Sequence, residues 1–154
     1  MNNLKELRGN ISVNEMTWLI LGGEKSIGQK PVSGLDYLVA ATSGIPKSSV
    51  ENLANVLNIP MRDMAILLNL SYKTLTRKKK DEVFGNLVSS LSVEIANTVA
   101  KGLAVFEDTE RLNRWLHKEN KALKGQKPFD LLNTPTGIKL VSQILGRIED
   151  GVYS

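Results

Sequence analysis

The sequence predicts an all-α protein, and three observations lead to that prediction. Apolar residues make up 42% of the 154 residues and aromatic residues only 5%, so the hydrophobic core must be built from aliphatic side chains. These aliphatic residues recur at the i, i+3, i+4 spacing that places them on one face of a helix. The period-two alternation of a half-buried strand is too weak to predict a sheet.

The N-terminal part of the chain, residues 1–34, is the hardest to assign. Residues 16–21 form a short apolar run that fits either a buried strand or a turn of helix, because length alone does not separate the two. Gly28, Pro31 and Gly34 then indicate a loop. The role of this segment therefore stays open.

Three short helices are expected next. They cover residues 35–42, a stretch from an N-cap at Ser48 or Ser49 to about Leu57, and residues 61–68. The second and third of them carry their apolar residues on one helical face, which they can bury against a common core.

The remaining elements are also expected to be helical. The pattern predicts a long helix over roughly residues 81–105, a helix that starts at Asp108 or Thr109, a polar turn over residues 120–127, one helical turn over residues 128–132, and a last helix. Thr134 and Pro135 are a typical N-cap and first residue of that last helix. Gly151 lies where its C-terminal cap would be.

Positive charge is concentrated in one segment. The formal net charge of the chain is +4, yet residues 71–80 alone carry five basic residues and no acidic one. The remainder of the chain is close to neutral, so this segment indicates a polyanionic partner. A solvated, lysine-rich helix end is the alternative explanation.

A helix–turn–helix fits residues 61–80, the region that contains this basic segment. Ala65 is the small residue that lets the second helix cross the first closely. Asn69 stands four positions later, where the turn needs a residue that tolerates a left-handed backbone. The residues expected to face the core are Met64, Leu68, Leu70 and Leu75. Ser71 is expected to cap the second helix.

The exposed residues of the second helix are of the types that bind DNA. Lysine and arginine neutralise phosphates, while threonine, tyrosine and serine bond phosphates or base edges. The candidate DNA-binding residues are Ser71, Tyr72, Lys73, Thr76, Arg77, Lys78, Lys79 and Lys80. Of these, Tyr72, Lys73, Thr76 and Arg77 are assigned to the major groove, and the three lysines mainly to phosphates. A single module binds weakly, so a homodimer on operator DNA is expected, with the apolar segment around Trp18 as its candidate surface.

The sequence offers little chemistry for an enzyme or a metal site. It contains no cysteine and one histidine, His117, around which no nucleophile and acid are arranged. Residues 23–30 approach a phosphate-binding loop, but Gln29 interrupts the required Gly-Lys-Ser/Thr ending. We therefore expect a protein that is not an enzyme, with no catalytic residue, cofactor or metal.

The chain is also expected to stay away from membranes. No stretch approaches the roughly 18 continuous apolar residues of a membrane span, and residues 1–10 are not followed by a signal-peptide pattern. The expected location is the cytoplasm, and the nucleoid when the protein is bound to its operator.

A series of motifs follows in close order near the C-terminus. They are Trp115-Leu116, Asn120, Ala122-Leu123, Gly125, Pro128-Phe129-Asp130-Leu131-Leu132, Thr134, Gly137, Val141 and the run from Leu145 to Tyr153. Together with the upstream run from Leu70 to Lys78, this series resembles the Xre/MbcA/ParS family of antitoxins over about residues 35–154. Two positions depart from the family pattern. Glu119 stands where proline is common, and Lys124 replaces a usual glycine.

The resemblance implies the antitoxin of a type II toxin–antitoxin system. Its C-terminal domain would bind a cognate RES-type toxin that degrades NAD or transfers ADP-ribose from it, and would obstruct the active site of that toxin. The complex would also bind its own operator and repress the operon. The toxin-binding candidates that the resemblance implies are Trp115, Asn120, Asp130, Arg147, Gly151 and Tyr153.

Physical chemistry gives some of these positions a simpler role. Trp115 on an amphipathic helix is more often a core residue than an interface residue, and Asn120 more often caps its own turn. Gly137 would permit close helix packing. Tyr153 is a large amphipathic side chain that nothing in a monomer requires, and we expect residues 147–154 to lie at the NAD entrance of the toxin.

Two other functions remain open. The chain could be a stand-alone helix–turn–helix regulator that senses a small ligand through residues 81–154, or a structural adaptor whose basic segment serves only solubility. The expected division of the chain is an N-terminal segment (1–34), a DNA-binding domain (35–80), a connecting helix (81–105) and a toxin-binding domain (106–154).

Overall fold

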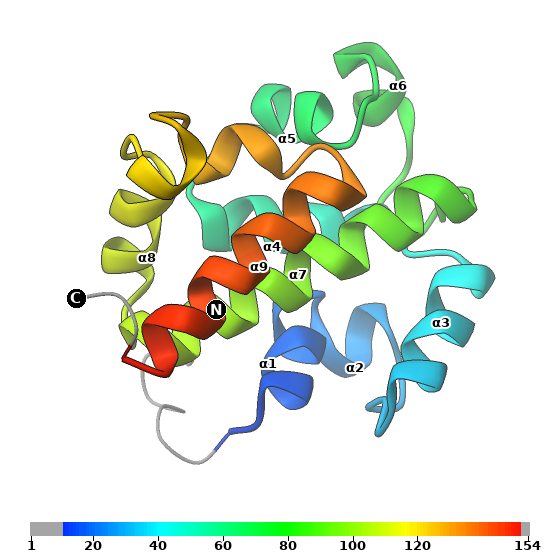
Figure 1. Cartoon of the computed structure of the whole chain (residues 1–154). Coiled ribbons are helices and arrows are strands. Elements are labelled where there is room, and N and C mark those ends of the chain that lie inside the picture. The colour runs from blue at the N-terminus through cyan, green and yellow to red at the C-terminus, as the bar shows by residue number, and fades with distance from the viewer. Residues whose placement is uncertain (1–10, 152–154) are drawn as a thin grey trace.

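The computed structural model describes residues 11–151, and its secondary structure within that range is helical (Figure 1). In these residues there is no strand, and the one extended pairing is an isolated antiparallel bridge between Pro46 and Val83. The predicted all-α class is confirmed.

The N-terminal part forms three helices, α1 (Val13–Ile20), α2 (Gly23–Ser26) and α3 (Gly34–Ser43). The apolar run left open between strand and helix is therefore helical, and the Ser12 side chain caps it by accepting from the Glu15 N–H. The segment around Trp18, the candidate dimer surface, gives Met16, Ile20 and Leu21 to the core, whereas Trp18 itself is half-buried. Its indole donates to the Gly28 carbonyl at 3.0 Å, and its role in a dimer stays a prediction.

The helix–turn–helix region contains α4 (Lys47–Leu57), α5 (Met61–Leu67) and α6 (Tyr72–Arg77). The expected cap of α4 at Ser48 or Ser49 is wrong, because the helix starts at Lys47 with Pro46 as N-cap. The first amides of α4 find partners in another segment. Lys47 N–H donates to the Glu82 carbonyl and Ser48 N–H to the Lys80 carbonyl, both at 3.0 Å. These bonds satisfy donors that a side-chain cap would otherwise have to satisfy.

The same pairing shortens the long helix that follows. This helix, α7 (Asn86–Phe106), begins five residues later than the sequence pattern predicts. Residues 80–84 instead run beside residues 45–48, where the Phe84 N–H donates to the Ile45 carbonyl at 3.0 Å. The chain then turns into α7 with Gly85 as the N-cap.

The C-terminal part consists of α8 (Thr109–Leu116), two short 3-10 helices, η2 (Lys121–Leu123) and η3 (Pro128–Leu131), and α9 (Pro135–Glu149). Asp108 is the N-cap of α8, so the predicted start of that helix is confirmed. Thr134 caps α9 by accepting from the Gly137 N–H, and Pro135 is its first residue, as predicted.

The long helix α7 lies at the centre of the molecule. The helices α1 and α3 pack on one part of its surface and α9 on another (Figure 1). A continuous hydrophobic core joins the N-terminal helices, the helix–turn–helix and the C-terminal helices, with members as distant in sequence as Ile20, Leu75, Ile95 and Leu145. None of the described helices is long and apolar enough to cross a membrane.

Candidate functional site

The helix–turn–helix has the internal geometry that the sequence predicts. Ala65 is buried, as are Met64, Leu68 and Leu75, so α5 and α6 share the core. Asn69 has φ +58°, the left-handed conformation expected of the turn. The turn is closed by the Leu70 N–H, which donates to the Ala65 carbonyl at 2.9 Å.

Ser71 caps α6 with its hydroxyl group. The Ser71 Oγ accepts from the Thr74 N–H at 3.0 Å and donates to the Thr74 hydroxyl at 2.7 Å. The predicted capping role is confirmed. Both hydrogen bonds join the cap residue to the first turn of α6, so the hydroxyl stabilises the start of the helix.

The four residues assigned to the major groove are all exposed on α6, namely Tyr72, Lys73, Thr76 and Arg77. Leu75 alone in this helix is buried, which turns the other side chains outward. Arg62, from the first turn of α5, holds its guanidinium 4.9 Å from the centre of the Tyr72 ring. It adds a cation to this surface that the sequence analysis missed, because ten residues separate the two side chains.

The three lysines that follow lie beyond the helix. Lys78 is the C-cap of α6 and has an extended backbone, and its ammonium lies 5.2 Å from the centre of the Phe84 ring. It is half-buried, whereas Lys79 and Lys80 are exposed. The Lys79 N–H donates to a carboxylate oxygen of Glu82 at 3.0 Å, which shapes this basic segment locally.

Lys47 is a second basic residue that the sequence analysis missed. Its ammonium donates to the carbonyl oxygens of Lys78 at 2.8 Å and Thr76 at 3.3 Å. These carbonyls belong to the C-terminal end of α6, about thirty residues further along the chain. No local sequence pattern indicates the contact, because it depends on the start of α4 meeting the end of α6 in the folded chain.

Two of the toxin-binding candidates are held inside the C-terminal part itself. Trp115 is partly buried against the core and its ring lies 5.5 Å from that of Phe106. Asn120 closes its own turn, where its side chain accepts from the Ala122 N–H and its carbonyl from the Gly125 N–H, both at 2.9 Å. Lys124 in the same turn has φ +55°, which explains why glycine is usual at this position.

Three further candidates are exposed. Asp130 lies on η3, Arg147 near the end of α9, and Gly151 just beyond it with φ +75°. The length of α9 between η3 and Arg147 separates the first from the other two by roughly 20 Å at 1.5 Å per residue. The structure therefore does not bring all the candidates into one cluster. Tyr153 lies outside the described residues.

Gly137 brings η3 close to the start of α9. A Cβ atom at this position would collide with the carbonyl oxygen of Leu131. The close packing predicted for Gly137 is confirmed, and its partner is the backbone of η3.

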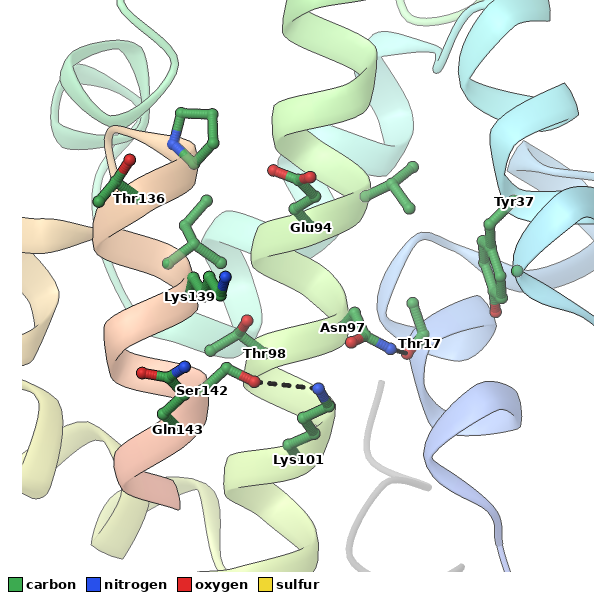
Figure 2. Close-up of a pocket in the computed structure, with 14 residues that line it drawn as sticks. Thr17, Tyr37, Glu94, Asn97, Thr98, Lys101, Thr136, Lys139, Ser142 and Gln143 are labelled. Atoms are coloured by element: carbon green, nitrogen blue, oxygen red, sulfur yellow. Dashed lines mark hydrogen bonds between the residues drawn. The ribbon is translucent and has the colours of Figure 1, made fainter. Parts of the chain in front are cut away.

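A groove of about 690 Å³ lies beside α7, with residues of α9 and of α1 and α3 around it (Figure 2). Some of its polar groups bond to each other. Lys101 donates to the Ser142 hydroxyl at 2.9 Å, and the Asn97 amide donates to the Thr17 hydroxyl at 3.3 Å (Figure 2). Among the described residues there is no cluster of histidine, aspartate and glutamate that could hold a metal ion.

Comparisons with known proteins match both parts of the chain. Residues 36–97 match the antitoxin Xre-like helix-turn-helix domain, and residues 101–151 match the antitoxin Xre/MbcA/ParS C-terminal toxin-binding domain. A curated protein from Sphingobium sp. (strain YBL2), named "Prs ADP-ribosylating antitoxin", is 25% identical over 134 residues. That similarity covers 79% of this chain and 83% of the Sphingobium protein.

Proposed function

We propose that this chain is an antitoxin of the Xre/MbcA/ParS type from a type II toxin–antitoxin system, and that it neutralises a RES-type toxin that targets NAD. It does so by obstructing the active site of the toxin, and it binds operator DNA to repress its own operon. The observation that carries the proposal is the presence of both domains in one chain, a DNA-binding fold and a toxin-binding fold, on a common core. Antitoxins of this family are not enzymes.

The class of toxin is supported by the similar Sphingobium protein. The name of that protein contains both the word antitoxin and the word ADP-ribosylating, and ADP-ribosylation is a reaction that takes ADP-ribose from NAD. An NAD-consuming partner is therefore the natural target of neutralisation. The partner of this chain either degrades NAD or transfers its ADP-ribose group.

The exposed candidates are the ones that we assign to direct contact with the toxin. Asp130 and Arg147 present opposite charges about one helix length apart, which suits a wide docking surface. Trp115 and Asn120 support that surface from within the C-terminal part. Tyr153 follows Arg147 and Gly151 in the chain, and we assign it the role of entering the NAD entrance of the toxin.

A truncation tests the role of Tyr153. Ending the chain after Asp150 should leave α9 intact, because the helix ends at Glu149. The truncated chain should bind the toxin but inhibit it poorly. Full inhibition by the truncated chain, measured as NAD consumption by the purified toxin, would contradict the assignment.

The DNA-binding role rests on the exposed face of α6. Side chains from Tyr72 to Arg77 would lie in the major groove, and the basic segment after the helix would follow the phosphates. The protein would act as a homodimer that reads two half-sites, in the cytoplasm and on the nucleoid. Its affinity for operator DNA should fall steeply with salt.

A ligand-sensing regulator is the alternative, and the groove beside α7 is the observation that favours it. A sensor pocket needs polar groups that are free to meet a ligand. Two polar pairs in this groove instead bond within the chain. We therefore place neutralisation first.

Expression of the neighbouring gene tests the proposal. The neighbour would be produced alone and together with this chain, while growth and cellular NAD are followed. Growth arrest with loss of NAD, both reversed by co-expression, is the expected result. Arrest and rescue without NAD loss would keep the antitoxin role and change the toxin class, and a harmless neighbour would favour the ligand-sensing regulator.

A further inference from the structure

The helix α3 carries apolar side chains on two faces. Its inner face packs on α7 through Tyr37 and Ala41, and the Tyr37 hydroxyl donates to the Asn14 carbonyl at 2.6 Å. Burial raises the pKa of Tyr37 to about 12, so its hydroxyl stays neutral and keeps that bond. The inner face therefore accounts fully for how α3 is attached to the molecule.

The outer face of α3 is aliphatic and open to solvent. Leu35, Leu38 and Val39 are 68%, 59% and 57% exposed, and Val32, just before the helix, is 80% exposed. We call these four residues the α3 face. Three of them follow the i, i+3, i+4 spacing that normally marks the buried side of a helix.

The α3 face carries no charged side chain. Asp36 is the one charged residue of α3, and its carboxylate is turned to the start of the helix, where it accepts from the Val32 N–H at 2.9 Å. Two more exposed aliphatic residues, Val83 and Leu87, lie in the segment that leads into α7 and at the start of that helix. Val83 lies against Gly44 at the end of α3, and Leu87 stands in the first turn of α7, 88% exposed.

We propose that the α3 face pairs with the α3 face of a second copy of this chain across a two-fold axis. A surface on a two-fold axis meets itself, so charges on it would repel, whereas an aliphatic stripe is self-complementary. The cation that lies beside Val32 and Val39 is Lys30, and its ammonium is paired with the Glu15 carboxylate at 3.6 Å, so the face favours an apolar partner over a nucleic acid or a strongly charged protein. The choice of a second copy rests on the proposed function, since one helix–turn–helix module reads only one half-site.

The extent of the surface fits the core of such an interface. The four side chains offer an apolar patch of a few hundred Å², a size that marks interaction sites. A stable interface buries about 800 Å² per partner, so the contact would extend over Val83 and Leu87. In this arrangement Val83 and Leu87 would lie at the edge of the interface.

The position of α3 leaves the other functions free. Figure 1 shows α3 on one side of the molecule, with α8 and the C-terminal end of α9 on the opposite side. Two of the toxin-binding candidates lie on those elements, Trp115 on α8 and Arg147 on α9. In the same view α6 lies at the top, apart from α3. A dimer through α3 can therefore bind toxin and DNA at the same time.

A disulfide test uses the absence of cysteine from the chain. In a Leu38→Cys variant, a disulfide can form only between two copies. Mild oxidation should convert most of this variant to a covalent dimer at micromolar concentration. The matched control is Leu140→Cys on α9, where the leucine is 45% exposed, and it should stay largely monomeric on a non-reducing gel. Equal cross-linking of the two variants would overturn the proposal.

A charge variant gives an independent measurement. Leu38→Glu places like charges across the axis, so sedimentation should show a monomer where the unaltered chain is a dimer. The variant should still rescue cells from the toxin, which shows that it folds. A monomeric unaltered chain or a dimeric Leu38→Glu would overturn the proposal. Loss of rescue with an unchanged oligomeric state would instead assign α3 to the toxin. A failure of rescue by the unaltered chain itself would count against the proposed function alone.

Discussion

Lys47, from the start of α4, holds the C-terminal end of α6. Its ammonium donates to the carbonyl oxygens of Lys78 and Thr76 at 2.8 and 3.3 Å. Carbonyls at a helix C-terminus lack partners within the helix and carry the negative end of its dipole, so a cation is favourable there. Because α6 has only six residues, it depends on such outside contacts for its shape.

Replacing Lys47 should therefore weaken DNA binding without any change to the exposed face of α6. We expect Lys47→Met to lower the free energy of unfolding by about 1 kcal/mol and to weaken operator binding several-fold. Lys47→Arg should retain most of both. Urea unfolding and fluorescence anisotropy with labelled operator measure the two effects. The control Lys25→Met removes an exposed charge from the same half, and an equal loss there would mean that only net charge matters.

Gly137 and Gly146 offer a matched pair on one helix. A Cβ at Gly137 meets the Leu131 carbonyl oxygen, whereas at Gly146 it meets open space. Gly137→Ala should destabilise the protein by about 1–3 kcal/mol through overpacking. Gly146→Ala should leave it unchanged or stabilise it by up to about 1 kcal/mol, since alanine favours the helix. Urea unfolding compares the two, and similar losses would contradict the packing of η3 on α9.

At the scale of the element, we expect α6 and the segment after it to bind different parts of the DNA. Arg77 closes the helix and is exposed on its outer face. Lys79 lies beyond the helix in the segment that pairs with the start of α4. A helical arginine in the groove can meet two acceptors of one guanine, whereas a lysine outside the groove meets phosphates.

This division predicts different losses from two substitutions. Arg77→Ala should reduce the preference for operator over random DNA by about 1–3 kcal/mol. Lys79→Ala should weaken binding to both DNAs alike and lower the slope of log affinity against log salt by about 1. Titrations on both DNAs at several salt concentrations measure these effects. The same loss of preference from both variants would be incompatible with separate roles.

At the scale of the whole molecule, the two matched domains share one hydrophobic core. Their boundary, between residues 97 and 101, falls within the single helix α7. Hydrogen bonds also cross between the parts. The Asn69 amide donates to the Asn133 carbonyl at 2.9 Å, and the Asn113 amide to the Val56 carbonyl at 3.2 Å. The turn of the helix–turn–helix is thereby attached to the loop before α9.

A continuous core should make unfolding a single transition. The two tryptophans report on different parts, Trp18 on α1 and Trp115 on α8. Trp18→Phe and Trp115→Phe each leave one reporter, and their fluorescence should change together with far-UV circular dichroism during urea unfolding. Separate midpoints for the reporters would show that the domains unfold independently.

Much of the fold follows from local signals in the sequence. The all-α class, the left-handed turn at Asn69, the caps at Ser71 and Thr134, and the start of α8 at Asp108 each depend on a few neighbouring residues. Capping and turn preferences act over one helical turn, so they can be predicted from the sequence without knowledge of the fold. The exposure of the α6 residues follows from helical periodicity in the same way.

Other features were decided only by tertiary packing. The start of α4 and the late start of α7 depend on residues 80–84 lying beside residues 45–48. The positions of Lys47 and Arg62 around α6 depend on how separate helices cross. The exposure of the aliphatic side chains of α3 is the reverse of what their apolar spacing favours. The sequence by itself determined which segments are helical and where charge gathers, because those properties are local. Which apolar face is covered and which cation meets which carbonyl were decided only by the packed structure, because they join residues that are distant in the chain.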